Sequence, residues 1–146
     1  MKHFTQFGLT KMPELMISDP NTWKHLQDHP AFKKFEFCKE WRTWYEGDNP
    51  ENDLHLLRQC AIELLKNRPD TKTELVLLDD LTVFVEIRIG GLTGQFGIGI
   101  SPNTVFVQLD PNPSNCNALA TEVDGLSISQ FVQTVCQFAE DSDFEA

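Results

Sequence analysis

The second half of the chain has almost no basic residues. Residues 73–146 contain one, Arg88, against 11 acidic residues, whereas residues 1–72 contain 11 residues of each sign. The whole formal net charge of -10 therefore belongs to the second half. Because a nucleic-acid-binding surface needs clustered lysine and arginine to neutralise phosphates, this shortage argues against direct nucleic-acid binding. A strongly acidic surface favours either solubility or encounter with a basic protein partner.

Long uninterrupted apolar runs are also absent. The most apolar windows, 75–78 and 81–89, are broken by Asp79, Asp80, Glu86 and Arg88. None approaches the roughly 20 residues that a membrane-spanning helix needs. The N-terminal residues contain no apolar stretch of the kind found in a secretory signal peptide. We therefore expect a cytoplasmic protein that does not insert into a membrane.

Cysteine is scarce, and its spacing carries no metal or redox motif. Cys38, Cys60, Cys116 and Cys136 lie far apart and include no C-x-x-C pair, so neither a zinc knuckle nor a dithiol redox centre is indicated. Scattered cysteines of this kind are most often buried free thiols, which suit a reducing compartment. The sequence predicts no cofactor and no metal.

The length of 146 residues fits one domain with a core of its own. Internal repeats and low-complexity tracts are lacking, so we interpret residues 1–146 as a single unit. Within it we expect an N-terminal arm at 1–17, a helical half at 18–69, a sheet with a final helix at 73–139, and an acidic tail at 140–146.

Two N-cap signals followed by proline predict helix starts in the first half. Asp19-Pro20 predicts a short helix that ends at Pro30, and Asn49-Pro50 predicts a longer helix that ends before Pro69. Between them, residues 31–46 predict another helix. Its bulky aromatic residues recur on one side, at Phe37, Trp41, Trp44 and Tyr45.

After Thr71 the apolar residues change from a helical period to strict alternation, which predicts strands. The expected strands cover 74–78, 81–89, 96–100, 105–109 and 119–123. Ser127 and Gln130 form the pattern of a capping box before a final amphipathic helix. The predicted fold is α+β, with N-terminal helices packed on an antiparallel meander of four to five strands and a C-terminal amphipathic helix.

Strand alternation also predicts a surface for a partner. If Val83, Val85 and their equivalents face the core, the opposite face carries two phenylalanines, two strand glycines and polar residues. Such a patch is typical of a binding site. It could equally be covered by helices, or each ring could shield a neighbouring glycine. The expected partner-binding residues are Phe84, Glu86, Phe106, Gln108 and Asp110, with the asparagine-rich loop 112–117 at the edge.

Candidate chemical groups are few. His25 and His29 have the four-residue spacing of helical metal ligands, with Asp28 and Glu36 nearby, but the sequence lacks the glutamate of an H-E-x-x-H site. Exposed histidines that bind nothing are the simpler interpretation. Cys60 and His55 are five residues apart, which turns them to different helix faces and argues against a thiol nucleophile with its base.

The glycine-rich run at 90–97 does not have the composition of a phosphate-binding loop. It lacks the Gly-Lys-Ser/Thr ending, and a strand rather than a helix is expected after it. Hairpin geometry explains these glycines. Since no catalytic triad, kinase motif or dinucleotide fingerprint occurs either, the sequence favours a binding protein over an enzyme.

The closing segment 122–131, EVDGLSISQF, together with the acidic meander, resembles the C-terminal parts of small acidic bacterial toxin-immunity proteins. The resemblance covers roughly the last 45 residues and rests on size and acidity. It implies a monomer or weak dimer that inhibits a basic toxin, such as a nuclease, by binding to it.

Two other interpretations stay open. Residues 81–109 and 127–139 are similar to the twisted sheet and closing helix of type III secretion chaperones, which implies an obligate dimer. Those chaperones place one helix before the sheet, and this chain places about 70 residues there. The third interpretation is an enzyme with a metal bound at His25 and His29, or with Cys60 as its thiol.

Overall fold

A seven-stranded sheet forms the centre of the molecule. The computed structural model describes residues 12–37, 49–111 and 120–145. The strands are β1 (Pro13–Ile17), β2 (Glu36–Phe37), β3 (Lys72–Leu78), β4 (Thr82–Ile89), β5 (Leu92–Ile98), β6 (Val105–Asp110) and β7 (Thr121–Leu126). Their spatial order is β1-β3-β4-β5-β6-β7, all antiparallel, and the short β2 pairs in parallel with the start of β4.

Tight turns fix the register of the meander. β3 and β4 are joined by residues 79–81, where the Leu81 amide donates to the Leu78 carbonyl at 2.9 Å and the Thr82 amide donates to Asp80 Oδ1 at 3.1 Å. β4 and β5 are joined by two glycines, and Gly90 has a φ of 58°. This left-handed conformation is accessible to glycine at little cost. The glycine-rich run therefore forms a hairpin, as its composition predicts.

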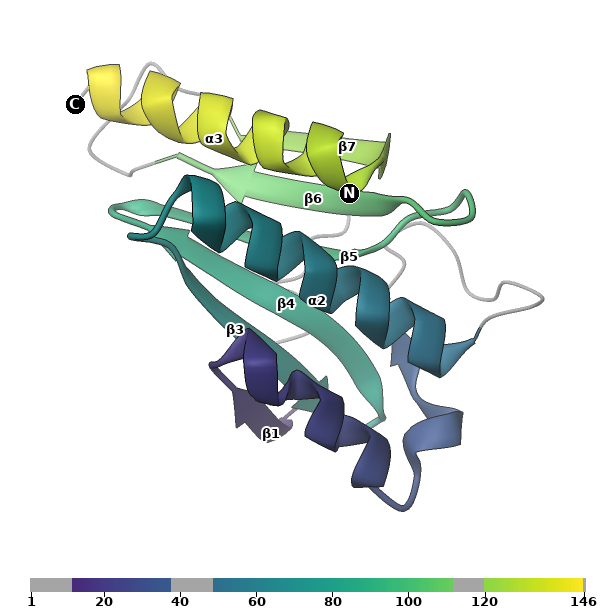
Figure 1. The fold of residues 1–146 in the computed structure, drawn as a ribbon. Coiled ribbons are helices and arrows are strands. Elements are labelled where there is room, and N and C mark those ends of the chain that lie inside the picture. Colours follow the sequence, from purple (N-terminus) through teal and green to yellow (C-terminus); the bar gives the residue numbers. More distant parts are fainter. Residues whose placement is uncertain (1–11, 38–48, 112–119, 146) are drawn as a thin grey trace.

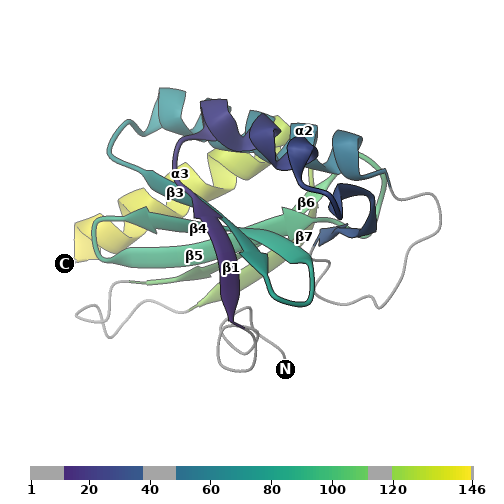
Figure 2. The same ribbon diagram turned by 90° about the horizontal axis from the view of Figure 1, so that it is seen from below.

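Within the described ranges, the helices all lie on one face of the sheet, which we call the inner face (Figure 1, Figure 2). They are the 3-10 helices η1 (Pro20–Asp28) and η2 (Phe32–Lys34) and the α-helices α2 (Pro50–Asn67) and α3 (Ile128–Glu145). Figure 1 shows α2 and α3 side by side along the sheet. The sequence-based expectation of an α+β fold with a C-terminal helix is confirmed.

Both α-helices begin with the caps that the sequence indicates. Asn49 Oδ1 accepts hydrogen bonds from the Glu51 amide at 3.0 Å and the Asn52 amide at 3.3 Å. In the capping box of α3, the Gln130 amide donates to Ser127 Oγ at 3.2 Å and the Ser127 amide donates to Gln130 Oε1 at 2.9 Å. These bonds satisfy amides that have no partner within the helix, so each cap sets where its helix starts.

The main core lies between the inner face and the helices. Phe96 of β5 and Phe131 of α3 are fully buried, with ring centroids 4.5 Å apart. Trp23 of η1 is also fully buried, and its indole nitrogen donates to the Ile17 carbonyl at 2.9 Å. The cap-plus-proline signal at Asp19 thus produces a 3-10 helix that fixes a core tryptophan.

The opposite face of the sheet, which we call the outer face, carries a second and smaller apolar cluster. Val76, Leu78, Phe84 and Phe106 form it, and each is less than 4 % exposed. The same strands send Val83, Val85, Val105 and their alternates to the main core. The predicted alternation of these strands is therefore correct.

Several sequence-based expectations of the first half were wrong in detail. Residues 13–17 of the expected arm form β1, which pairs with β3, so four to five strands was too few. Residues 31–37 of the expected helix form η2 and β2, and its remainder, with Trp41, Trp44 and Tyr45, lies outside the described residues. Nor do residues 140–145 form a separate tail, since α3 continues to Glu145.

The second half of the chain departs less from the elements that its sequence predicts. β5 covers Leu92–Ile98 rather than 96–100, so Gly94 lies within the strand. Ile100, the last residue of the expected strand, lies outside it and is 41 % exposed. Loop 112–117 lies outside the described residues. Within the described ranges, each helix is too short or too polar to cross a membrane.

Candidate functional site

The outer face carries a row of acid and amide side chains that crosses four strands. Glu74 of β3 lies directly opposite Glu86 of β4, Glu86 opposite Gln95 of β5, and Gln95 opposite Gln108 of β6. Adjacent strands are about 4.8 Å apart, so neighbouring members of the row lie within side-chain reach. We call these four residues the acid-amide row.

A basic pair lies beside this row, two residues further along each strand. Lys72 of β3 is directly opposite Arg88 of β4, and the line continues through Thr93 to Asp110 of β6. Two like-charged pairs are thus placed across neighbouring strands, Glu74 with Glu86 and Lys72 with Arg88. Such pairs destabilise a sheet when nothing neutralises them.

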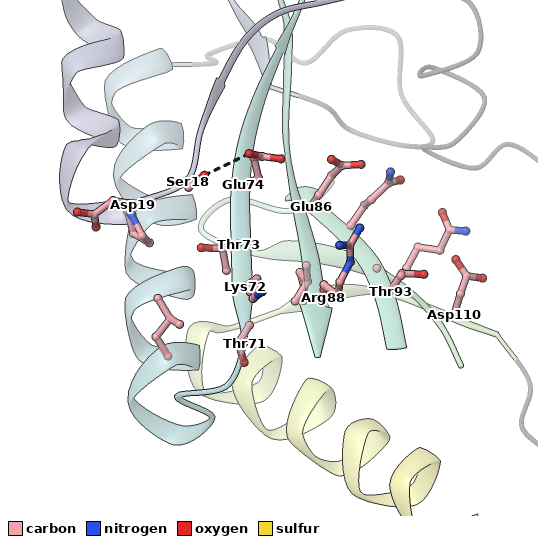
Figure 3. A pocket seen from close by; sticks show the side chains of 16 residues that line it. Ser18, Asp19, Thr71, Lys72, Thr73, Glu74, Glu86, Arg88, Thr93 and Asp110 are labelled. Atoms are coloured by element: carbon pink, nitrogen blue, oxygen red, sulfur yellow. Dashed lines mark hydrogen bonds between the residues drawn. The ribbon is translucent and has the colours of Figure 1, made fainter. Parts of the chain in front are cut away.

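These side chains line a pocket of about 540 Å³ (Figure 3). Its walls come from β3 to β6, from Ser18–Pro20 and from Leu65 of α2. β1 pairs with β3 only from Leu75 to Leu78, which leaves the first residues of β3 at an edge. The pocket reaches round this edge, since Thr71 and Thr73 line it together with Glu74. Its volume falls within the ~300–1,000 Å³ of ligand sites.

Two buried polar atoms in the pocket wall have no hydrogen-bond partner within the described part of the chain. They are Oε1 of Gln95, a residue 9 % exposed, and Oγ1 of Thr71, a residue 5 % exposed. Leaving a buried polar atom without a partner costs about 1–3 kcal/mol. Both atoms can accept a hydrogen bond, and a donor that reached either of them would recover this free energy.

The two glutamates of the row differ in their contacts. Glu74 Oε2 accepts a hydrogen bond from Ser18 Oγ at 3.2 Å (Figure 3). Glu86 forms no hydrogen bond or ion pair with the residues that the structure describes. Figure 3 shows both carboxylates along the same side of the sheet, with Arg88 beside Glu86. Glu86 is therefore the carboxylate of the row that has no hydrogen-bond partner among the described residues.

The structure brings three of the five predicted partner-binding residues into the pocket. Glu86, Gln108 and Asp110 line it. Phe84 and Phe106 lie further along the same face but are 3 % and 1 % exposed, so neither ring is offered to a partner in this structure. Phe106 is directly opposite Gly97, the arrangement in which an aromatic ring shields a strand glycine. Their role in binding stays a prediction.

The sequence interpretation missed Glu74, Lys72, Arg88 and Gln95. A usable signal existed, because the turn at 79–81 centres the first hairpin on Asp80. Counting outward from Asp80 pairs residue 74 with 86 and residue 72 with 88, as the structure does. The row depends on this register, which composition and alternation alone do not supply.

His25 and His29 do not have the arrangement of two metal ligands on one face of an α-helix. His25 and His29 belong to a 3-10 helix and its C-cap, and with about three residues per turn their side chains point in different directions. His29 Nδ1 accepts a hydrogen bond from the Ala31 amide at 3.1 Å, and its ring packs 5.2 Å from that of Phe35. His29 therefore has a structural role in the turn.

The Cys60 thiol lies in the main core. The residue is fully buried, and burial raises the pKa of its thiol to about 12, so the thiol is protonated near neutral pH and is a poor nucleophile. His55 is exposed. Cys60 and Cys136 are both free, and Cys38 and Cys116 lie outside the described residues. Among the residues that the structure describes, no three histidine, cysteine or acidic side chains form a group that could hold a metal ion.

Comparison with known proteins adds no relative. No family model, no curated protein and no solved structure matches this chain. The case for a function therefore rests on the pocket.

Proposed function

We propose that the protein is a cytoplasmic protein-binding module that inhibits a basic partner, such as a toxin, by contacting it through the outer face of the sheet. The observation that carries this proposal is the acid-amide row, in which two neighbouring carboxylates and a buried amide acceptor line one pocket. A cationic partner would pair with these carboxylates and donate hydrogen bonds to them.

The distribution of charge supports the same role. All of the excess of ten negative charges lies in residues 73–146, which contain β4 to β7 and α3. A surface of this kind accelerates encounter with a positively charged protein and selects against acidic ones. The pocket provides a place where the encounter becomes a specific contact.

The proposal is tested by capturing partners with matched charge variants. Tagged wild-type protein is compared with Glu86→Gln/Asp110→Asn in the pocket and with Glu140→Gln/Asp28→Asn, which removes equal charge at exposed helix positions. We expect wild type and control to retain one basic protein in equimolar amount, and the pocket variant to lose it. The activity of the retained protein is then measured with and without the module, and inhibition is expected.

Two results would contradict the proposal. Loss of the partner from both variants alike would show that overall charge, rather than the pocket, holds it. Failure to retain any basic protein would remove the protein-binding role. The mass of the free protein in solution distinguishes the inhibitor from the secretion chaperone. An inhibitor is expected as a monomer or weak dimer, and a secretion chaperone as an obligate dimer.

A further inference from the structure

The pocket on the outer face has the chemistry of a site for one particular side chain. Three of its wall residues, Glu74, Glu86 and Gln95, lie in line on three adjacent strands. Two are carboxylates, and the third presents a buried amide oxygen with no partner among the described residues. The matching ligand is a cation with several hydrogen-bond donors.

We infer that the pocket binds an arginine side chain of the partner, held by Glu74, Glu86 and Gln95, with an acidic residue of the same partner segment placed on Lys72 and Arg88. This inference rests on the proposed function and specifies its contact.

Arginine fits this wall better than lysine does. The row spans about 10 Å from Glu74 to Gln95, since it covers two strand spacings. A guanidinium carries five donors in a plane and can bridge two carboxylates, whereas an ammonium acts as a point charge with three donors. Ser18 already occupies one oxygen of Glu74, so Glu86 and Gln95 provide the acceptors without partners among the described residues.

The basic pair defines what lies next to the arginine. Lys72 and Arg88 stand two residues along the strands from Glu74 and Glu86, a separation of about 6.6 Å. An extended peptide has the same spacing between side chains two positions apart. A partner segment with arginine and an acidic residue separated by one residue would therefore neutralise both like-charged pairs, whereas a run of arginines would meet Lys72 and Arg88.

Short peptides test this inference on the full chain. The probes are acetylated and amidated peptides with the sequences Gly-Arg-Gly-Glu-Gly, Gly-Lys-Gly-Glu-Gly and Gly-Arg-Gly-Lys-Gly. Binding is followed by nuclear magnetic resonance, through the backbone amides of β3 to β6 and the side-chain amide of Gln95. We expect the first peptide to bind most tightly and to shift the Gln95 side-chain signals.

Two pocket variants and one control variant separate binding from folding. Glu86→Gln should weaken the first peptide about tenfold, the usual loss for one hydrogen bond between charged groups, while Glu140→Gln on α3 should leave its affinity unchanged. Gln95→Met should also weaken binding, yet its stability should equal or exceed that of wild type, because the buried oxygen without a partner is gone. If Gln95 had only a structural role, replacing it would not weaken peptide binding while stability is kept.

The outcomes distinguish the pocket from the wider function. Equal affinity for all three peptides, or signal shifts outside the pocket, would overturn the arginine site even if a basic partner is captured. Selective binding of the first peptide with loss in Glu86→Gln supports the site. If no basic protein is then captured, the site stands and the inhibitory function falls.

Discussion

The two faces of this sheet are built from alternate residues of the same strands, yet they meet different demands. On the inner face, β4 to β6 contribute only apolar side chains or glycine, and these pack under α2 and α3. On the outer face, a small apolar cluster gives way to an acid-amide row and then to a basic pair.

The contrast between the two faces separates residues that stabilise the fold from residues that do not. Burial of the inner face stabilises the fold at about 25 cal/mol for each Å² of apolar surface removed from water. The outer face contains directly opposed like charges and a buried amide oxygen without a partner among the described residues. These features cost stability, and proteins tend to retain such costs at functional sites.

The largest expected effect is the loss of stability on replacing Phe131, a core residue beneath the inner face. It is fully buried and packs against Phe96, so Phe131→Ala should lower the free energy of unfolding by about 3–5 kcal/mol. Denaturant titration measures the change. The folded fraction should bind the arginine peptide as wild type does. A loss below about 1 kcal/mol would show that the inner face is not the main source of stability.

The next effect concerns the close contact of β5 with β6. A Cβ atom added at Gly94 would lie 2.6 Å from the Gln108 carbonyl oxygen and 2.7 Å from Leu109 Cδ2. Gly94→Ala should therefore cost about 1–3 kcal/mol through strand displacement. Gly90→Asn is the matched control, since its site is open and asparagine tolerates a positive φ. Equal thermal stability of the two variants would contradict this packing.

A smaller effect is expected at the start of α3, the helix that covers β6 and β7. Ser127→Ala removes one half of the capping box and should cost about 1 kcal/mol. Ser129→Ala, at an exposed position of the same helix, should have little effect. Both are measured by thermal unfolding, and a larger loss in the second variant would show that the cap does not fix this helix.

The smallest effect is expected in the short connection between α2 and β3. Arg68 donates two hydrogen bonds to Asp70, at 2.9 and 3.0 Å, and these lower the pKa of the Asp70 carboxyl below its ordinary value of 3.8. A lowered pKa stabilises the fold above the ordinary value, and this contribution disappears as the pH falls through the folded-state value. The stability difference between wild type and Asp70→Asn should therefore shrink below about pH 4. A difference that does not change with pH would exclude this linkage.

Local signals were enough to predict part of this fold. The Asn49-Pro50 start, the Ser127 capping box and the alternation of β4 each depend on residues close in sequence, and all three are confirmed. The helix expected at 31–46 rested on the spacing of Phe37, Trp41, Trp44 and Tyr45, of which the structure describes only Phe37, in β2. The residues before it form a 3-10 turn, in which Phe32 and Phe35, three apart, meet edge to face. β1 was missed because its residues are mostly exposed and have no period.

The candidate site could be predicted only in part for a different reason. Glu86 and Gln108 were identified because alternation assigns them to one face, and Asp110 because it lies beside the loop expected at the edge of the site. Their neighbours Glu74 and Gln95 join them through pairing between strands, which depends on hairpin register. The burial of Phe84 and Phe106 depends on tertiary packing, which strand alternation does not determine.

The most direct test of this account is a single comparison of stability and binding for Glu86→Gln. We expect a free energy of unfolding within about 0.5 kcal/mol of wild type, together with a loss of about tenfold in affinity for the Arg-Gly-Glu peptide. Unchanged affinity, or a loss that only follows loss of stability, would contradict the claim that the outer face is a binding surface.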